Sequence, residues 1–427
     1  MASTVHIDGS LPGAGTNPST GTVFADGWAV DYDWHADRVV ASGQPRRLSS
    51  LGFPAPFDSR LEGVLRGQAA FTGFLYLFQD GQYLKLRESD MTPVQEPRPT
   101  AAAWGLPPSW TSFDAVFPGG GVKSRFAYFF HGAEYVRFDW ATDRPSPGYP
   151  RRIGPNWHTS GPFTSGIDGV IIGLDGFATK AYLFKTITVT VDDSGALGPG
   201  HTVQVPVYAR YDFDKEIVDH VVDDPRQVIA NWRGLFPLLD AGAAVDVALG
   251  WTAPALIALA AKAASLTAGT PSDPATDAAL SHHFMTSTPD LGRVNAILTR
   301  MTDIQNRIRA IPTAFRWTPG LAFDAQTAPA TLTEIGDTFS TESGPNARAA
   351  VQIHEASHFI ETGNPVDVPE WQGETVNGQL HPAPPGQPAY HTITPDQALT
   401  NPSSYAAFAQ EIAFGQDTRF GAGRPQE

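Results

Sequence analysis

The strongest chemical signal in the sequence is a pair of histidines four residues apart, in the segment 353–359, which reads I-H-E-A-S-H-F. Residues at this spacing share one face of a helix, so His354 and His358 can offer two imidazole nitrogens to one metal ion. Glu355 stands beside that face, where its carboxylate can take a proton from an attacking water. Residues 346–352 are rich in helix formers and follow a Gly-Pro pair, which predicts a helix that starts near residue 346.

A third metal ligand is expected downstream of these histidines. Asp367 follows nine residues after His358, and a turn at Gly363-Asn364-Pro365 could bring its carboxylate back to the metal. On spacing alone, Glu361 and Glu374 compete with Asp367 as the third metal ligand. Two histidines and one carboxylate form a zinc site that leaves a position open for water. The alternative is a chance motif, expected in about one or two per cent of chains with this histidine content, and the apolar residues that flank the motif favour a true site.

These motifs resemble those of the aspzincins, the group that contains deuterolysin and the lysine-specific metalloendopeptidases. The resemblance rests on the H-E-A-S-H-F motif, on Asp367 thirteen residues after the first histidine, and on two flanking segments. Residues 333–339 are similar to the edge strand that precedes the active-site helix, and residues 401–409 fit a late helix written N-x-x-x-Y-x-x-F. The resemblance implies that Glu355 is the general base and that the Zn²⁺ ligands are His354, His358 and Asp367.

One position departs from the aspzincin pattern. The family carries G-T-x-D-x-x-Y-G around the aspartate, and its tyrosine helps to stabilise the oxyanion of the tetrahedral intermediate. Here Glu370 stands at the tyrosine position, and an ionised carboxylate donates no hydrogen bond. Tyr390 and Tyr405 are the candidate replacement donors. The sequence therefore supports zinc binding better than it supports proteolysis. The alternative function is that of a non-catalytic binding protein whose zinc site is structural or vestigial.

The first 250 residues contain a repeat. Each segment begins with an acidic residue in an apolar setting, continues with an aromatic strand and a second strand, and closes with a Pro-Arg pair. The acidic positions are Glu62, Asp114, Asp168 and, in a weaker match, Asp246. The tryptophans that stand seven residues after each such proline are Trp104, Trp157 and Trp232. The acidic positions are 52, 54 and then 78 residues apart, and the long last interval predicts an inserted hairpin over residues 186–205.

The N-terminal segment completes the repeat. Residues 20–50 match the middle and outer strands of a repeat, and residues 236–250 match its missing start. The last blade is therefore predicted to be split between these two segments, which would close the ring and leave only short sheet edges.

The repeats resemble hemopexin domains, which form four-bladed β-propellers. The resemblance implies a central channel in which backbone carbonyls can hold Ca²⁺ or Na⁺, near the acidic residues Glu62, Asp114, Asp168 and Asp246. The alternative is that these side chains only order the inner strands. The Tyr and Phe ladders are interpreted as packing between blades.

Composition excludes several classes of partner and site. The net charge of -15 and the pI of about 5.2 argue against nucleic acid or an anionic membrane as a partner. The chain has no cysteine, which excludes disulfides and thiolate metal sites. The apolar run 253–268 is interrupted by Lys262, so it predicts a soluble helix rather than a membrane span. The N-terminus shows no Sec signal, which leaves a cytoplasmic location or non-classical export open.

Together these patterns predict a multidomain chain. An all-β four-bladed propeller is expected over residues 1–250, followed by a mainly α (α+β) zincin-like metalloprotease domain over residues 251–427. Further helices are expected at residues 254–266, 277–284 and 294–311. His282 and His283 are interpreted as surface or packing residues, since adjacent residues on a helix face apart. The predicted function is that of a zinc-dependent endopeptidase acting on a protein or peptide, with the propeller as its protein-binding module.

Overall fold

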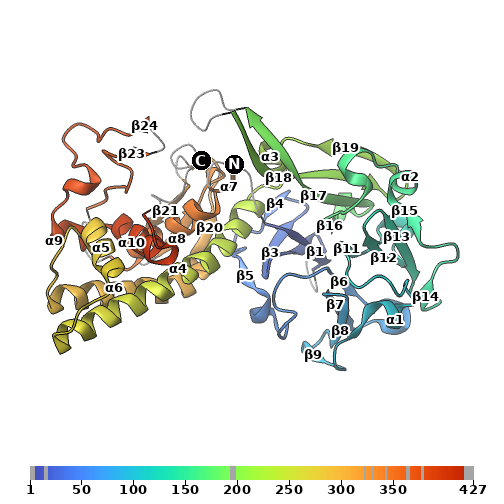
Figure 1. The fold of residues 1–427 in the computed structure, drawn as a ribbon. Coiled ribbons are helices and arrows are strands. Elements are labelled where there is room, and N and C mark those ends of the chain that lie inside the picture. The colour runs from blue at the N-terminus through green and yellow to red at the C-terminus, as the bar shows by residue number, and fades with distance from the viewer. Residues whose placement is uncertain are drawn as a thin grey trace. The chain divides into compact units, whose positions relative to one another are not determined.

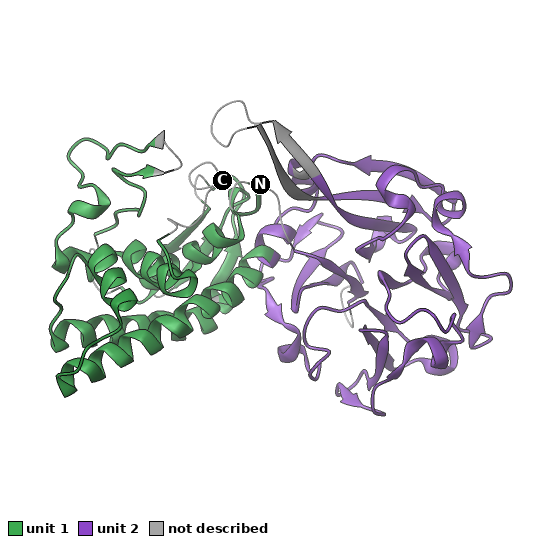
Figure 2. Ribbon diagram, in the orientation of Figure 1, with its two compact units in different colours: residues 1, 190–203, 240–427 green, residues 2–189, 204–239 purple. Residues whose placement is uncertain are grey.

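The computed structural model describes residues 5–13, 18–192, 199–321, 324–328, 331–341, 344–361, 366–376 and 379–417. The chain divides into two compact units (Figure 2). Unit 2 contains residues 2–189 and 204–239 and is built from β-sheets, whereas unit 1 contains residues 1, 190–203 and 240–427 and is mainly helical. The chain thus has a β-rich N-terminal part and a helical C-terminal part, and the division falls near residue 240 rather than 250.

The described strands of the β-rich part form three sheets. The first sheet has the order β1-β2-β3-β4, and its strands are β1 (Ile7–Pro12), β2 (Thr20–Ala25), β3 (Trp28–Asp33), β4 (Arg38–Val39) and β5 (Arg46–Arg47), which also pairs with β3. The second sheet joins two repeats, and its strands are β6 (Gly63–Arg66), β7 (Phe74–Gln79), β8 (Gln82–Arg87), β9 (Thr92–Pro93), β10 (Arg98–Pro99), β11 (Ala115–Pro118), β12 (Phe126–His131), β13 (Glu134–Asp139), β14 (Arg144–Pro145) and β15 (Arg151–Arg152). The third sheet contains β16 (Gly169–Ile172), β17 (Lys180–Asp192), β18 (Pro199–Asp212) and β19 (Ile217–Val222).

The four inner strands of these sheets are neighbours in cyclic order. Strand β1 contacts β6 and β16, and β11 contacts the same two strands. Figure 1 shows the four strands gathered at the centre of unit 2. Neighbouring backbones approach so closely that a Cβ atom on Gly63 would lie 2.0 Å from the carbonyl oxygen of Val116, and one on Gly169 would lie 1.7 Å from that of Ile7. Among the described strands, however, no hydrogen-bonded sheet closes on itself.

The three repeat tryptophans pack between successive groups of strands. They end or cap the short helices α1 (Thr100–Trp104), α2 (Ile153–Trp157) and α3 (Pro225–Asn231), and all three are buried. Their ring contacts have centroid distances of 4.5–5.4 Å and join Trp104 to Tyr76 and Phe129, Trp157 to Phe130 and Tyr211, and Trp232 to Tyr182 and Tyr32. The aromatic ladders are therefore core packing, as the sequence predicted.

The predicted split blade is wrong. Residues 236–250 belong to the continuous helix α4 (Leu235–Ala268), because this Ala- and Leu-rich stretch favours helix along its whole length. Strand β1 supplies the inner strand of the first sheet instead. Asp246 is exposed on α4, so it does not join the other acidic repeat positions. The long strands β17 and β18 are hydrogen-bonded neighbours where the inserted hairpin was predicted, while the turn at Asp193-Ser194-Gly195 lies outside the described residues.

Within the described residues, unit 1 consists of helices and two small sheets, one of three strands and one of two. Its helices after α4 are α5 (Pro274–Phe284), α6 (Leu291–Ala310), α7 (Thr338–Thr341), α8 (Pro345–Phe359), α9 (Pro395–Ala398) and α10 (Pro402–Phe414). Its strands are β20 (Phe315–Trp317), β21 (Ala325–Ala328), β22 (Leu332–Ile335), β23 (Thr375–Val376) and β24 (Gln379–Leu380). The predicted helices at 277–284, 294–311, 346 onward and 401–409 are confirmed within a few residues, and the one predicted at 254–266 is part of α4.

Helix α8, which carries the histidine pair, packs against α6, α10 and strand β21. The expected edge strand at 333–339 is wrong in position. Strand β22 is central in the order β20-β22-β21, and helix α7 begins at Thr338, so β21 is the edge strand beside α8. The Arg348 guanidinium anchors α8, because it donates to the Asp240 carboxylate of α4 at 2.8 Å with both side chains buried.

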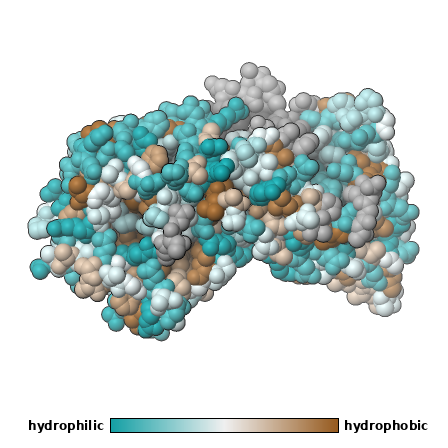
Figure 3. Space-filling model, turned by 180° about the vertical axis from the view of Figure 1, so that it is seen from behind, coloured by the Kyte–Doolittle hydropathy of each residue, from teal (hydrophilic) through white to brown (hydrophobic). Residues whose placement is uncertain are grey.

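Among the described helices only α4 is long and apolar enough to cross a membrane by length and composition. Its polar side chains nevertheless have partners within unit 1. Lys262 pairs with Asp277 at 2.6 Å, and the Thr252 hydroxyl accepts a hydrogen bond from Gln305 at 3.2 Å. Such contacts are typical of the core helix of a globular unit. On the face drawn in Figure 3, hydrophobic residues are scattered among polar ones. Among the described residues, the most exposed large hydrophobic side chain is that of Ile257 on α4.

Candidate active site

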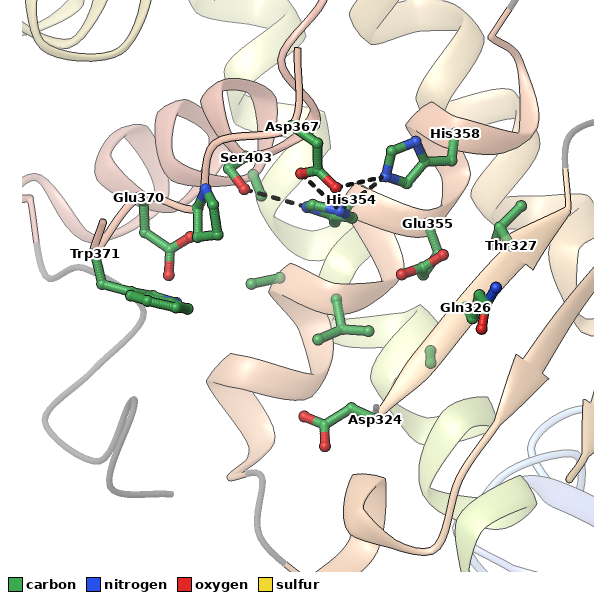
Figure 4. A pocket seen from close by; sticks show the side chains of 15 residues that line it. Asp324, Gln326, Thr327, His354, Glu355, His358, Asp367, Glu370, Trp371 and Ser403 are labelled. Atoms are coloured by element: carbon green, nitrogen blue, oxygen red, sulfur yellow. Dashed lines mark hydrogen bonds and ion pairs between the residues drawn. The ribbon is translucent and has the colours of Figure 1, made fainter. Parts of the chain in front are cut away.

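Three side chains of unit 1 converge on one point, as Figure 4 shows. The Nε2 atoms of His354 and His358 are 3.0 Å apart, and they lie 3.5 Å and 3.6 Å from the two carboxylate oxygens of Asp367. Tetrahedral zinc with bonds of 2.0–2.1 Å separates its ligand atoms by about 3.3 Å. The donor set and its spacing therefore fit a zinc ion with three protein ligands and a fourth position left open.

Helix α8 fixes both histidines, and helix α10 fixes their surroundings. Ser403 of α10 lies 3.2 Å from His354, between its Oγ and the ring Nδ1, and so orients the imidazole whose other nitrogen faces the ligand cluster. The Asn401 side chain, at the N-cap of α10, donates to the carbonyl oxygen of Val368 at 3.0 Å and accepts from its N–H at 2.9 Å. Val368 follows Asp367, so Asn401 holds the third ligand in place. The sequence marked Asn401 only as part of a helix motif.

Glu355 lies next to the ligand cluster. Its side chain is buried, and its Oε2 atom has no hydrogen-bond partner. Burial raises the pKa of this carboxyl, while hydrogen bonding to Thr327 of β21 and the charge of His358 oppose the shift. A raised pKa makes the carboxylate a stronger base. Figure 4 shows the group directed into the space between α8 and β21.

The ligands and Glu355 line one pocket of about 670 Å³. Its walls come from β21 and the residue before it, from α8, from the segment around Asp367, and from α10; besides the ligands they include Asp324, Gln326, Thr327, Glu370, Trp371 and Ser403. The space is large enough for several residues of an extended peptide.

The competing third ligands are engaged elsewhere. Glu361 is paired with Arg300, and Glu374 is paired with His391. Among the carboxylates considered from sequence, Asp367 alone joins the two histidines in the candidate metal cluster. The predicted turn at residues 363–365 lies outside the described residues.

The structure does not bring either candidate tyrosine to the pocket. The Tyr405 hydroxyl donates to the carbonyl oxygen of Leu399 at 2.9 Å, and the fully buried Tyr390 hydroxyl lies 3.1 Å from Nδ1 of His283. Neither residue lines the pocket. Trp371, which sequence analysis passed over, does line it, and its indole N–H is buried without a hydrogen-bond partner.

His282 and His283 do not face apart as predicted. His282 Nδ1 and His283 Nε2 lie 3.0 Å and 2.7 Å from the carboxylate of Glu411 on α10. The two rings reach one carboxylate because each presents a different nitrogen. His283 is fully buried, in agreement with a packing role.

The acidic repeat positions of unit 2 share a second pocket of about 350 Å³, lined in part by Glu62, Asp114 and Asp168. Their carboxylates accept backbone hydrogen bonds from Gly81 and Gly132, in the hairpin turns of their own repeats, and from Thr186, within β17. Burial raises the pKa of Glu62 to about 7. These side chains therefore hold the strands of their own repeats through backbone hydrogen bonds. They also line one common pocket.

Comparisons with known proteins find one family match and several similar solved structures. The hemopexin family model matches residues 113–158, which cover the repeat that begins at Asp114. A similar solved structure is the hemopexin fold protein CP4 from cow pea, with 20% identity over 49% of this chain and 95% of that chain and a TM-score of 0.36. A plant lectin with two metal binding sites from Cicer arietinum has 16% identity over 55% of this chain and 99% of that chain, with a TM-score of 0.39. A zinc peptidase from Grifola frondosa has 19% identity over 40% of this chain and 93% of that chain, with a TM-score of 0.27. Among curated proteins none matches. The chain has a hemopexin-like, β-rich N-terminal part and a mainly helical C-terminal part.

Proposed function

We propose that the chain is a zinc-dependent endopeptidase whose metal ligands are His354, His358 and Asp367. One observation carries the proposal: three ligand atoms converge at tetrahedral spacing while the buried Glu355 carboxylate opens into the same pocket. A purely structural zinc site does not need such a base, since it is normally closed by four protein ligands.

When bound, zinc supplies a Lewis acid that polarises the substrate carbonyl and makes water more acidic. Glu355 accepts a proton from water as the water oxygen bonds to the carbonyl carbon. It then gives this proton to the amide nitrogen as the C–N bond breaks, so that an acid and an amine are released. Strand β21 is a sheet edge that lines the pocket, and an extended substrate can pair with it through backbone hydrogen bonds.

The oxyanion donor in this proposal is Trp371. Glu370 occupies the family's tyrosine position and, when ionised, only accepts hydrogen bonds. The next residue, Trp371, lines the same pocket, and its buried indole N–H has no partner. A buried donor without a partner is available for the charge that develops on the substrate oxygen.

The test is zinc content together with peptide-library cleavage for wild type, Glu355→Gln and Asp396→Asn. Asp396 is an exposed acid (86%) of α9 and serves as the matched control. Equal zinc in all three chains, with cleavage lost only in Glu355→Gln, is the expected result. If wild type binds zinc but cleaves no peptide, the proposed catalysis is wrong. If wild type binds no zinc, the proposed metal site is wrong.

The second candidate function is non-catalytic binding with a structural zinc ion. Glu370 favours it, because no tyrosine hydroxyl lines the pocket among the described residues. Zinc retention without cleavage is its predicted signature.

For unit 2 the proposal is a four-bladed propeller that binds protein. The cyclic contacts of β1, β6, β11 and β16 support four blades, as do the tryptophans between them. The pocket shared by Glu62, Asp114 and Asp168 is the candidate channel mouth for Ca²⁺ or Na⁺. The channel role predicted for Asp246 is not retained, because this residue is on α4.

A further inference from the structure

The first sheet of unit 2 contains an acidic residue that corresponds to the repeat positions. Asp8 lies in Ile7-Asp8-Gly9 at the start of β1, with the same apolar–acidic–small pattern as Leu61-Glu62-Gly63 and 54 residues before it. In the other three repeats the acidic side chain accepts a hydrogen bond from a backbone N–H 18 or 19 residues further along the chain, at Gly81, Gly132 and Thr186. Those carboxylates are thereby satisfied by the protein itself.

Asp8 departs from this rule. Its side chain is completely buried, and its Oδ2 atom has no hydrogen-bond partner. Its Oδ1 atom lies 3.2 Å from Nδ1 of His6. At the turn between β2 and β3 stands a second carboxylate, Asp26, whose Oδ2 accepts the His6 backbone N–H at 2.7 Å. One ligand atom from each of the three side chains lies within 4.8 Å of the others.

This arrangement has an unbalanced charge. Burial raises the pKa of Asp8 to about 6; the nearby Asp26 charge adds to the shift, while His6 and a backbone hydrogen bond from Leu61 oppose it. A buried carboxylate oxygen without a donor is costly, and a second carboxylate beside it adds repulsion. A bound cation would remove both costs, since it would give Oδ2 of Asp8 a partner and neutralise the charges of the Asp8 and Asp26 carboxylates.

We propose that His6, Asp8 and Asp26 form a binding site for a divalent first-row transition-metal ion in unit 2, separate from the site on α8. An imidazole nitrogen with two carboxylates suits Zn²⁺, Mn²⁺ or Co²⁺, whereas Ca²⁺ prefers oxygen ligands alone. His6 lines the 350 Å³ pocket, and its side chain is 17% exposed, which gives the ion a route of entry. The ion would tie the start of β1 to the β2–β3 turn.

The experiment removes the other site first. In the full-length chain with His354→Ala and His358→Ala, isothermal titration with Zn²⁺ is expected to show one equivalent bound by unit 2. Adding Asp8→Asn, which keeps the side-chain volume, should weaken this binding at least tenfold, and adding His6→Ala should do the same. Asp90→Asn is the matched control, because this acid of another repeat is exposed (46%), pairs with Arg87 and does not line the pocket. It should bind Zn²⁺ like the parent.

Several results would overturn the site. The parent double variant could bind no Zn²⁺, or the affinity could be unchanged in both Asp8→Asn and His6→Ala. Binding of Ca²⁺ but not Zn²⁺, unaffected by His6→Ala, would instead indicate an oxygen-only site in the shared pocket. Circular dichroism and thermal melting of each variant identify misfolding, and the partly exposed His6 gives a variant that should stay folded if Asp8→Asn does not.

Discussion

The side-chain amide of Asn401 binds both backbone groups of Val368, at 2.9 Å to the N–H and 3.0 Å to the carbonyl oxygen. All four atoms are buried. This pair links the N-cap of α10 to the residue after Asp367, so the position of the third metal ligand depends on a helix whose N-cap lies 33 residues after Val368.

Asn401→Ala is therefore expected to weaken zinc binding by about 10–100-fold, the usual effect of removing a group that orients a ligand. Competition with a chromogenic chelator measures the affinity. Ser404→Ala is the control, because it removes a contact of the same amide (3.1 Å) and leaves both bonds to Val368. Wild-type affinity in Asn401→Ala would show that Asp367 is held by other contacts.

Trp371→Phe tests the proposed oxyanion donor. It keeps an aromatic ring in the pocket and removes the N–H, so kcat should fall by about 10²–10³ while KM and zinc content stay near wild type. Steady-state kinetics on the best library peptide measure the change. Trp317→Phe is the matched control, because its N–H is bound to Asp337 at 2.7 Å and Trp317 does not line the pocket. Equal kcat in the two variants would exclude Trp371 as the donor.

The local part of the site could be predicted from sequence because a helix converts spacing into geometry. His354, Glu355 and His358 need only the regular turn of α8 to reach their places. The interaction of Asn401 with Val368 and the pocket position of Trp371 depend on how separate segments pack, and no local pattern encodes them. The same holds for His282 and His283, which converge on a carboxylate of another helix.

The repeat could be predicted in outline, and the misplaced strand has a physical explanation. Asp246 matches the repeat pattern of an acidic residue in an apolar setting. The strong helix formers around it nevertheless place it on α4 rather than on an inner strand. Asp8 carries the regular interval of 54 residues and a following glycine, the residue that the close approach of inner strands requires. The interval and the glycine together mark β1 as the inner strand of the first sheet.

The buried ion pair between Arg348 and Asp240 is predicted to matter for the stability of unit 1. Arg348→Ala leaves the Asp240 carboxylate buried without its cation, so the free energy of unfolding should fall by about 3–5 kcal/mol. Urea unfolding, followed by the helical signal, measures the change. The exposed pair of Arg316 (52% exposed) with Glu334 is the control, and Arg316→Ala should cost about 1 kcal/mol or less. Similar losses in both variants would contradict the argument.

Glu411 gives the fold a predictable sensitivity to acid. Burial would raise the pKa of this carboxyl, but hydrogen bonds and charge from His283 and His282 outweigh it, so its pKa in the folded chain lies below the ordinary 4.5. A lowered pKa contributes stability that is complete above the unfolded-state value and is lost as the pH falls through the folded-state value. The melting temperature of wild type should therefore drop below about pH 4.5. Glu411→Gln should be less stable at pH 7, by about 2 kcal/mol, and should lose less stability on acidification. Melting curves from pH 7 to pH 3 compare the two chains, and parallel curves would show that Glu411 makes no such contribution.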